Sequence, residues 1–227
     1  MKYRQRLIAE MEEITNNMQF VRMFESKLAS FTGFNQAVCV DCCTNGILVA
    51  LELCARNGTV NKGFTRLEMP ARTYMSVPMT LINNGWWVSL EDIDWYGQYR
   101  LGPTPVYDAA TDFDADMADR YPADSFVCVS FQQKKRLSLG RGGAILLNSA
   151  DHAAVLRRMV YDGRDPFIPD RIEVEKFPDD IIRGYHCYMD PEKAALGIAR
   201  LNQLSVPYSP RGAGDYQDLR RLKIWTA

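Results

Sequence analysis

The segment from Ser130 to Gly143, SFQQKKRLSLGRGG, brings together side chains that could do chemistry. It follows an apolar strand pattern and supplies a hydroxyl, adjacent lysines at 134 and 135, and a glycine-rich turn. This combination could serve catalysis, because a turn at a strand end can present a nucleophilic amine to a ligand. A basic surface loop is the alternative interpretation, and the segment alone does not choose between them.

Three further segments also place polar groups just after apolar strands. Cys42 to Gly46, CCTNG, joins a strand to a helix, and a helix N-terminus with the Thr44 hydroxyl could bind a phosphate; an ordinary N-cap at Thr44 is the alternative. Tyr74 could stack on a planar cofactor or pack in the core. Asp108 follows an apolar run, where a carboxylate needs a partner; a helix cap is its alternative role.

The six cysteines suggest two further kinds of site. Cys39 and Cys42 form a C-x-x-C pair, which could be half of a zinc site or a redox pair. A zinc site needs a second pair, and the spacing of the remaining cysteines and of His152 and His186 does not provide one. We therefore expect buried thiols in a reducing compartment, and no metal.

Composition limits the class of protein. The chain has 227 residues, with 27 Lys and Arg against 28 Asp and Glu. This balance gives no indication of nucleic-acid binding, although a local basic patch remains compatible with it. No apolar run approaches the roughly 20 residues that a membrane span requires, and residues 1–18 do not resemble a signal peptide. We expect a soluble cytoplasmic protein.

The elements that would position these groups alternate between strand and helix. Short apolar runs predict strands at 36–40, 66–70, 86–92, 105–110, 125–131 and 142–148. Apolar residues at helical spacing predict helices within 1–32 and over 41–55, 73–85, 152–163 and 191–204, with a surface loop over 164–180. Gly33 should end the first helical region, and a short closing helix is expected after residue 205.

Such alternation predicts an α/β fold in which a mainly parallel sheet lies between helices on both faces. Ligands of such sheets bind where loops leave the carboxyl ends of the strands. Chemistry is therefore expected just after residues 40, 70, 107 and 129.

In this order the segments resemble the DegT/DnrJ/EryC1/StrS family of pyridoxal phosphate (PLP)-dependent sugar aminotransferases, of fold type I. The resemblance covers residues 24 to 204. The matching segments are FESKLASFTGFNQAVCVDCCTNGILVALEL (24–53), MPARTYMSV (69–77), NGWWVSLEDID (84–94), VYDAA (106–110), SFQQKKRLSLGRGGAI (130–145) and GYHCYMDPEKAALGIARLNQL (184–204).

The resemblance implies a role for each site residue. Lys135 is the catalytic Schiff-base lysine, because it lies five residues after Ser130, and Lys134 is out of register. Asp108 pairs with the pyridinium nitrogen and Tyr74 stacks on the ring. Ser130 holds the phosphate together with the Thr44 hydroxyl and the backbone amides of Cys43, Thr44 and Asn45. His186 stands where the family has an Asn that reaches the phosphate of the neighbouring subunit's site.

The chain departs from the family pattern at several places. Cys42 and Cys43 replace Ser-Gly in the phosphate turn, Thr111 replaces Gln or His, and Arg141 replaces Glu. With Lys134, Arg136 and Arg72, Arg141 predicts a basic pocket mouth suited to an anionic or nucleotide-linked substrate; a solvated charge run is the alternative.

The resemblance also implies domains, activity and assembly. Residues 1–204 form the PLP-binding large domain, and 205–227 a short tail where the family has a small domain. We expect an aminotransferase acting on a sugar or nucleotide-linked ketone. The alternatives are a PLP-dependent decarboxylase or lyase, and a non-catalytic binding protein of the same fold. A homodimer with shared active sites is expected.

Overall fold

The computed structural model describes residues 17–167, 181–204 and 208–225. Its helices are α2 (Met18–Thr32), α3 (Cys43–Arg56), α4 (Ser76–Asn83), α5 (Ala150–Val160) and α6 (Pro191–Leu201). Its strands are β1 (Gln36–Val40), β2 (Arg66–Pro70), β3 (Trp87–Glu91), β4 (Tyr99–Arg100), β5 (Val106–Asp108), β6 (Phe126–Ser130) and β7 (Gly143–Leu147). Apart from the closing helix, every strand and helix predicted above within these ranges is present, most with shifted ends, and β4 is additional.

Local signals explain where the helices begin and end. Helix α2 stops at Gly33, whose φ of 81° lies in the left-handed region that glycine adopts without strain. Helix α6 starts at Pro191, and the Asp190 carboxylate accepts the Glu192 N–H at 2.8 Å. The part of the first helical prediction before residue 17, and most of the predicted 164–180 loop, lie outside the described residues.

The sheet is mixed, so the prediction of a mainly parallel sheet is wrong. Five strands are ordered β1-β7-β6-β5-β4, and only β5 and β6 pair in parallel. Strand β7 pairs antiparallel with both β1 and β6. The physical reason is that residues 131–142 between β6 and β7 contain no helix, and a parallel return usually needs a helical crossover.

The directions of the strands nevertheless bring their carboxyl ends together at one edge of the sheet, where the site was predicted. Strands β2 and β3 pair in parallel, and an antiparallel bridge between Glu68 and Gly102 joins β2 to the chain just after β4. Combining the pairings, β1, β2, β3, β5 and β6 point one way, whereas β4 and β7 point the other. The carboxyl ends of β1, β2, β5 and β6 therefore share one edge.

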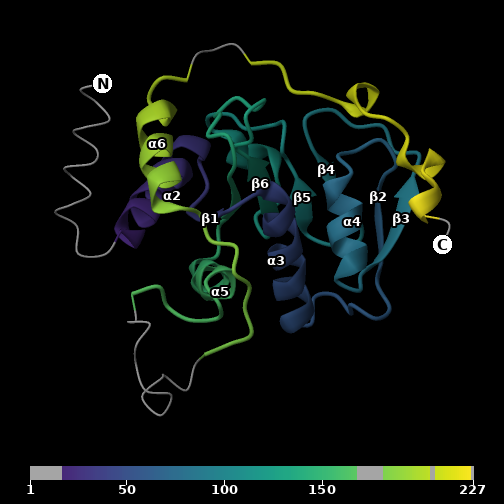
Figure 1. Cartoon of the computed structure of the whole chain (residues 1–227), viewed down its shortest axis with the longest axis horizontal. Helices are drawn as coiled ribbons and strands as arrows, with labels where there is room; N and C mark the ends of the chain where they lie inside the picture. The colour runs from purple at the N-terminus through teal and green to yellow at the C-terminus, as the bar shows by residue number, and fades with distance from the viewer. Residues whose placement is uncertain (1–16, 168–180, 205–207, 226–227) are drawn as a thin grey trace.

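Helices cover both faces of the sheet, as predicted (Figure 1). Along β6, Cys128 faces the layer of α3, α4 and α5, and Val127 and Val129 face the layer of α2 and α6. All five residues of β6 are buried, which explains its continuous apolar sequence. This three-layer arrangement fixes the strand ends that carry the site.

Residues 208–225 run along the edge of the molecule from the α6 side to β2 and β3 (Figure 1). Three short 3-10 turns, Ala213–Asp215, Leu219–Arg221 and Lys223–Trp225, stand where a closing helix was predicted. Backbone hydrogen bonds fix the segment: Ala213 N–H donates to Trp95 O at 3.0 Å, and Leu219 N–H to Ala71 O at 2.9 Å. Among the described helices, none combines the length and apolar character needed to cross a membrane.

Candidate active site

A cavity of about 830 Å³ opens at the shared carboxyl edge of the strands. Seven of the eight predicted site residues line it: Cys43, Thr44, Asn45, Tyr74, Asp108, Ser130 and Lys135. A cavity of this size is in the range of small-molecule and cofactor sites. The structure thus brings together residues that lie almost 100 positions apart in the chain.

The N-terminus of α3 forms one wall of the cavity. Cys42 precedes the helix in an extended conformation, and Cys43 is the first helical residue, so this turn does not require the glycine that the family pattern has. The Cys43 thiol points inward and donates to Cys128 O at 3.4 Å. The Thr44 and Ser76 hydroxyls are 2.7 Å apart, which places the start of α4 beside the start of α3. The N–H groups at the start of α3 and these hydroxyls suit an oxyanion.

Gly143 lets β7 approach this helix start closely. A Cβ added at Gly143 would lie 2.6 Å from Cys43 N, 2.8 Å from Val129 O and 2.9 Å from Cys42 C. These atoms all belong to the backbone, so no side-chain movement could make room. The glycine turn therefore sets where the α3 N-terminus sits.

Asp108 ends β5 and is almost completely buried. One carboxylate oxygen accepts the Tyr99 hydroxyl at 2.8 Å and the other accepts Ala110 N–H at 2.9 Å. The Tyr99 hydroxyl also lies 2.7 Å from the Thr73 hydroxyl, so these three side chains form a connected polar group. Burial raises the pKa of Asp108, and these two hydrogen bonds and the charge of Lys135 oppose that rise.

Lys135 projects into the cavity from the loop between β6 and β7. Leu137 and Leu139, which are buried in the core, anchor the loop beside it. Burial lowers the pKa of the Lys135 amine, the negative charge of Asp108 opposes this, and the positive charge of Arg211 adds to it. A lysine with a lowered pKa is more often in the neutral, nucleophilic form. Lys134 lines the cavity as well but is exposed.

Aromatic side chains enclose the cavity. Tyr74 is 60% exposed, so the alternative of a core residue is wrong. Trp95 was missed by the sequence analysis; its ring packs edge-on against Tyr99 at 5.1 Å and tilted against Tyr216 at 5.5 Å. Its indole N–H donates to Arg72 O at 2.9 Å.

Two predicted site residues lie in different places: Ser130 lines the cavity and His186 does not. Ser130 is buried at the end of β6, and its hydroxyl accepts Gln132 N–H at 3.4 Å. His186 is exposed and outside the cavity lining; its Nδ1 lies 3.0 Å from the Asp162 carboxylate. Its assignment to a neighbouring subunit's site stays a prediction.

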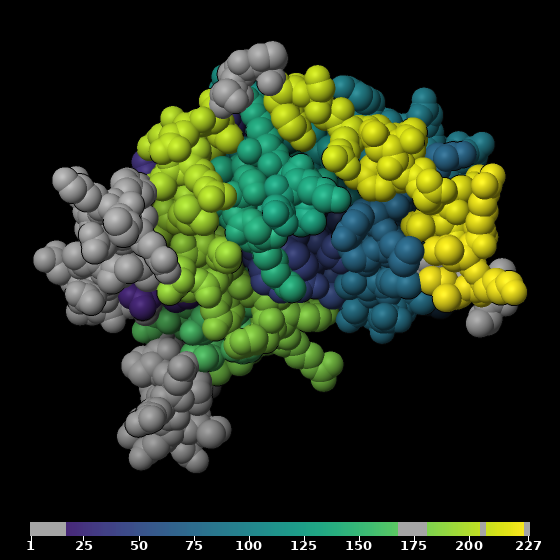
Figure 2. Space-filling view, turned by 45° about the horizontal axis from the view of Figure 1, so that its top comes forward, coloured from purple at the N-terminus to yellow at the C-terminus, as the bar shows by residue number. Residues whose placement is uncertain are grey.

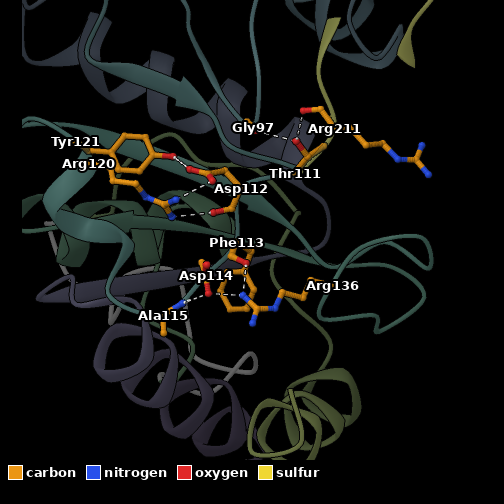
Figure 3. A network of polar contacts seen from close by, with 10 residues as sticks. All are labelled: Gly97, Thr111, Asp112, Phe113, Asp114, Ala115, Arg120, Tyr121, Arg136 and Arg211. Carbon is orange, nitrogen blue, oxygen red and sulfur yellow. Dashed lines mark hydrogen bonds and ion pairs between the residues drawn. The ribbon is translucent and has the colours of Figure 1, made fainter. Parts of the chain in front are cut away.

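The predicted basic mouth is only partly correct. Lys134 and Arg141 line the cavity, but Arg141 forms an ion pair with Asp41 at 2.7 Å. Arg136 does not line it: its side chain is almost fully buried and is bound to Asp114 and to Phe113 O (Figure 3). Arg72 is also outside the lining. Arg211, from the C-terminal segment, lies there instead.

The cysteines are free thiols, and all but Cys42 are buried. Cys39 lies inside β1, where its N–H donates to the buried Glu25 carboxylate at 2.9 Å. Within the described ranges, no group of three or more His, Cys, Asp or Glu side chains is arranged to hold a metal ion.

Comparison with known proteins identifies the part of the chain that carries Asp108 and Lys135. Residues 104–212 match the model of the DegT/DnrJ/EryC1/StrS aminotransferase family. This part of the chain is similar to that family. The resemblance found in the sequence is therefore confirmed. No curated protein matches the chain.

Solved structures show the same fold. A putative PLP-dependent aminotransferase from Bacillus cereus ATCC 10987 aligns with a TM-score of 0.69 and 21% identity, over 88% of this chain and 63% of that one. Sugar aminotransferase CalS13 from Micromonospora echinospora aligns with a TM-score of 0.62 and 19% identity, over 82% and 60%. DesI, solved in the presence of its TDP-sugar product, aligns at 0.59 and 22%, over 82% and 53%. The chain has fold type I and spans less than two thirds of the length of these proteins.

Proposed function

We propose that this chain is a PLP-dependent aminotransferase that uses Lys135. The observation that carries the proposal is that one cavity holds both a half-buried lysine of lowered pKa and a buried carboxylate. The family match over residues 104–212 and the fold type I neighbours support it. We further propose a sugar or nucleotide-linked substrate, because DesI was solved with a TDP-sugar product.

The residues present fit PLP. Asp108 supplies a buried acceptor for a protonated ring nitrogen, Tyr74 an exposed aromatic face, and the α3 N-terminus with Thr44 and Ser130 an anion site for the phosphate. Gly143 keeps the backbone amides of that helix start in place. When bound, PLP supplies an electron sink for negative charge on the substrate carbon that bears the amine.

The chain's own groups would then perform the following steps. The Lys135 amine would hold PLP through the cofactor's aldehyde group, and once free it could take and return the proton at the reacting carbon. Asp108 would hold the protonated ring nitrogen, and the hydrogen bonds from the Tyr99 hydroxyl and Ala110 N–H favour its ionised form. Trp95 and Tyr216 wall the cavity and limit the access of water.

The test is a half-reaction with the purified chain. We expect PLP to bind with a visible absorption band, and borohydride to leave a stable pyridoxyl adduct on Lys135. Added glutamate should convert the cofactor to its pyridoxamine form without release of carbon dioxide. Carbon dioxide release without that conversion would favour a decarboxylase, and a chain that binds no PLP would contradict both.

A homodimer is part of the proposal. His186 is exposed beside Tyr188 on a surface away from its own chain's cavity lining, which fits a role toward a second subunit. Light scattering should give twice the monomer mass of 25.9 kDa. A monomer would remove the support for the role of His186.

Gly143→Ala should weaken PLP binding through the phosphate cradle. The added methyl group collides with the backbone of Cys42, Cys43 and Val129, so we expect a loss of about 1–3 kcal/mol of stability and a displaced α3 N-terminus. PLP affinity, measured by absorbance titration, should fall at least about tenfold, which corresponds to about 1.4 kcal/mol.

Gly197→Ala is the matched control for that experiment. Its methyl group would collide with the Phe24 ring, in the packing of α6 on α2 and outside the cavity lining. This variant should lose stability but keep its PLP affinity. Equal losses of affinity in both variants would contradict the cradle role of Gly143.

A further inference from the structure

The segment that begins at Arg211 is fastened to the mouth of the cavity. The Arg211 carbonyl accepts Gly97 N–H at 2.8 Å, and the next residue, Gly212, forms an antiparallel bridge with Tyr96. Figure 2 shows this C-terminal segment, in yellow, lying along the rim of the blue and teal parts of the chain. Arg211 therefore has a fixed backbone position beside the cavity.

The Thr111 side chain also holds the Arg211 backbone in this position. Its buried hydroxyl lies within hydrogen-bond distance of two carbonyl oxygens, Gly97 O at 2.9 Å and Arg211 O at 3.1 Å (Figure 3). It is only three residues from Asp108, so the strand end that carries the buried carboxylate also holds Arg211. The residue that departs from the family pattern here thus positions the C-terminal segment.

The arginines near the cavity differ in whether a carboxylate pairs with them. Arg141 is paired with Asp41, and Arg136 with Asp114. Within the part of the chain that the structure describes, no carboxylate forms an ion pair with Arg211, although Arg211 is one of the residues that line the cavity. Its positive charge is close enough to Lys135 to contribute to lowering the pKa of that amine. An anion placed between two cations would remove this repulsion.

We propose that Arg211 binds the anionic group of the substrate, a carboxylate or phosphate oxygen group that enters beside Lys135. The proposal rests on the aminotransferase function and gives that site its substrate-recognition residue. A guanidinium forms paired, charge-assisted hydrogen bonds with either group. An amino acid carries its carboxylate on the carbon that bears the amine, and a nucleotide-linked acceptor carries phosphate, so both substrates of the reaction could use it.

The experiment measures anion binding by calorimetry, with PLP added to the chain. Succinate probes the carboxylate source, and uridine 5′-monophosphate the phosphate source. We expect Arg211→Gln to weaken the binding of at least one probe about tenfold or more, and Arg211→Lys to recover part of the loss. Arg221→Gln is the matched control, because Arg221 carries the same charge on the same segment outside the cavity lining.

The outcome identifies the source of the anion. A loss confined to succinate assigns Arg211 to the amino donor, a loss confined to the nucleotide assigns it to the acceptor, and a loss of both supports a shared site. The proposal is overturned if wild type binds neither probe, if Arg211→Gln binds both as wild type does, or if Arg221→Gln shows the same loss.

Cofactor binding separates this proposal from the proposed function. Arg211→Gln should keep the PLP absorption band and the borohydride adduct on Lys135. If the variant instead loses PLP, Arg211 serves the cofactor and the substrate assignment is wrong. If wild type binds no PLP but loses anion binding on Arg211→Gln, the aminotransferase function fails while the anion site stands.

Discussion

Lys135→Ala is expected to lose the borohydride-stable pyridoxyl adduct and to lower the rate of amino transfer by a factor of about 10⁴. The variant loses both the amine that holds the cofactor aldehyde and the base that moves the substrate proton. Because burial lowers the pKa of this amine, removing it takes a disfavoured charge from the fold, and the variant should remain folded. Peptide mass spectrometry after reduction, with single-turnover kinetics, measures both effects.

Lys134→Ala is the matched control, one residue earlier in the same loop. Lys134 lines the cavity but is exposed, so its loss should leave the adduct on Lys135 and most of the activity. An adduct that is found on Lys134 in the wild-type chain, or that survives in Lys135→Ala, would show that the assigned register is wrong.

Much of the fold could be predicted because apolar runs mark buried strands regardless of what they pair with. The predicted strands at 36–40 and 66–70 have the observed bounds of β1 and β2. Strand direction is a different property, because a buried apolar run carries no information about it. The helix-free connection at 131–142 was visible in the sequence and is the signal that could have predicted the antiparallel return of β7.

That most of the predicted site residues lie in one cavity could be expected, because the strand ends that carry them meet at one edge. Asp108 and Ser130 end β5 and β6, which run in parallel, and Cys43 follows β1, which points the same way. Their chemistry therefore converges even though the sheet is mixed. The prediction of Lys135 over Lys134 depended on family register and had no local physical signal.

The other residues of the cavity could not be predicted from local patterns. Trp95 lines the cavity, and Tyr99 binds Asp108 from β4, a strand of two residues that is too short to leave an apolar run. Arg211 reaches the cavity because its carbonyl meets Gly97 N–H and the Thr111 hydroxyl, 100 or more positions earlier in the chain. Such contacts depend on the assembled fold, and the segment around Arg211 has a composition that predicts only turns.

Asp108→Asn is expected to lower the rate of amino transfer about 100-fold or more while raising the stability of the PLP-free chain at neutral pH. Activity falls because a neutral amide cannot balance the positive charge of a protonated ring nitrogen. Asp112→Asn is the control for activity: Asp112 accepts the Tyr121 hydroxyl at 2.8 Å and pairs with Arg120 at 3.1 Å outside the cavity lining (Figure 3), so PLP binding should persist.

The stability gain follows from the sign of the pKa shift of Asp108. Burial raises that pKa above the ordinary value of 3.8, so between the two values the folded chain binds more protons than the unfolded chain. The free energy of unfolding of wild type therefore falls as pH rises through this window and stays lowered at pH 7. The Asp108→Asn variant has no carboxylate at this position, so its free energy of unfolding does not fall in this way. Urea unfolding without PLP should show the variant gaining on wild type as pH rises from 3.5 to 8, in steps of about one pH unit. A gap that stays constant over this range would show that the pKa of Asp108 is not raised in the folded chain, and would contradict the predicted gain in stability.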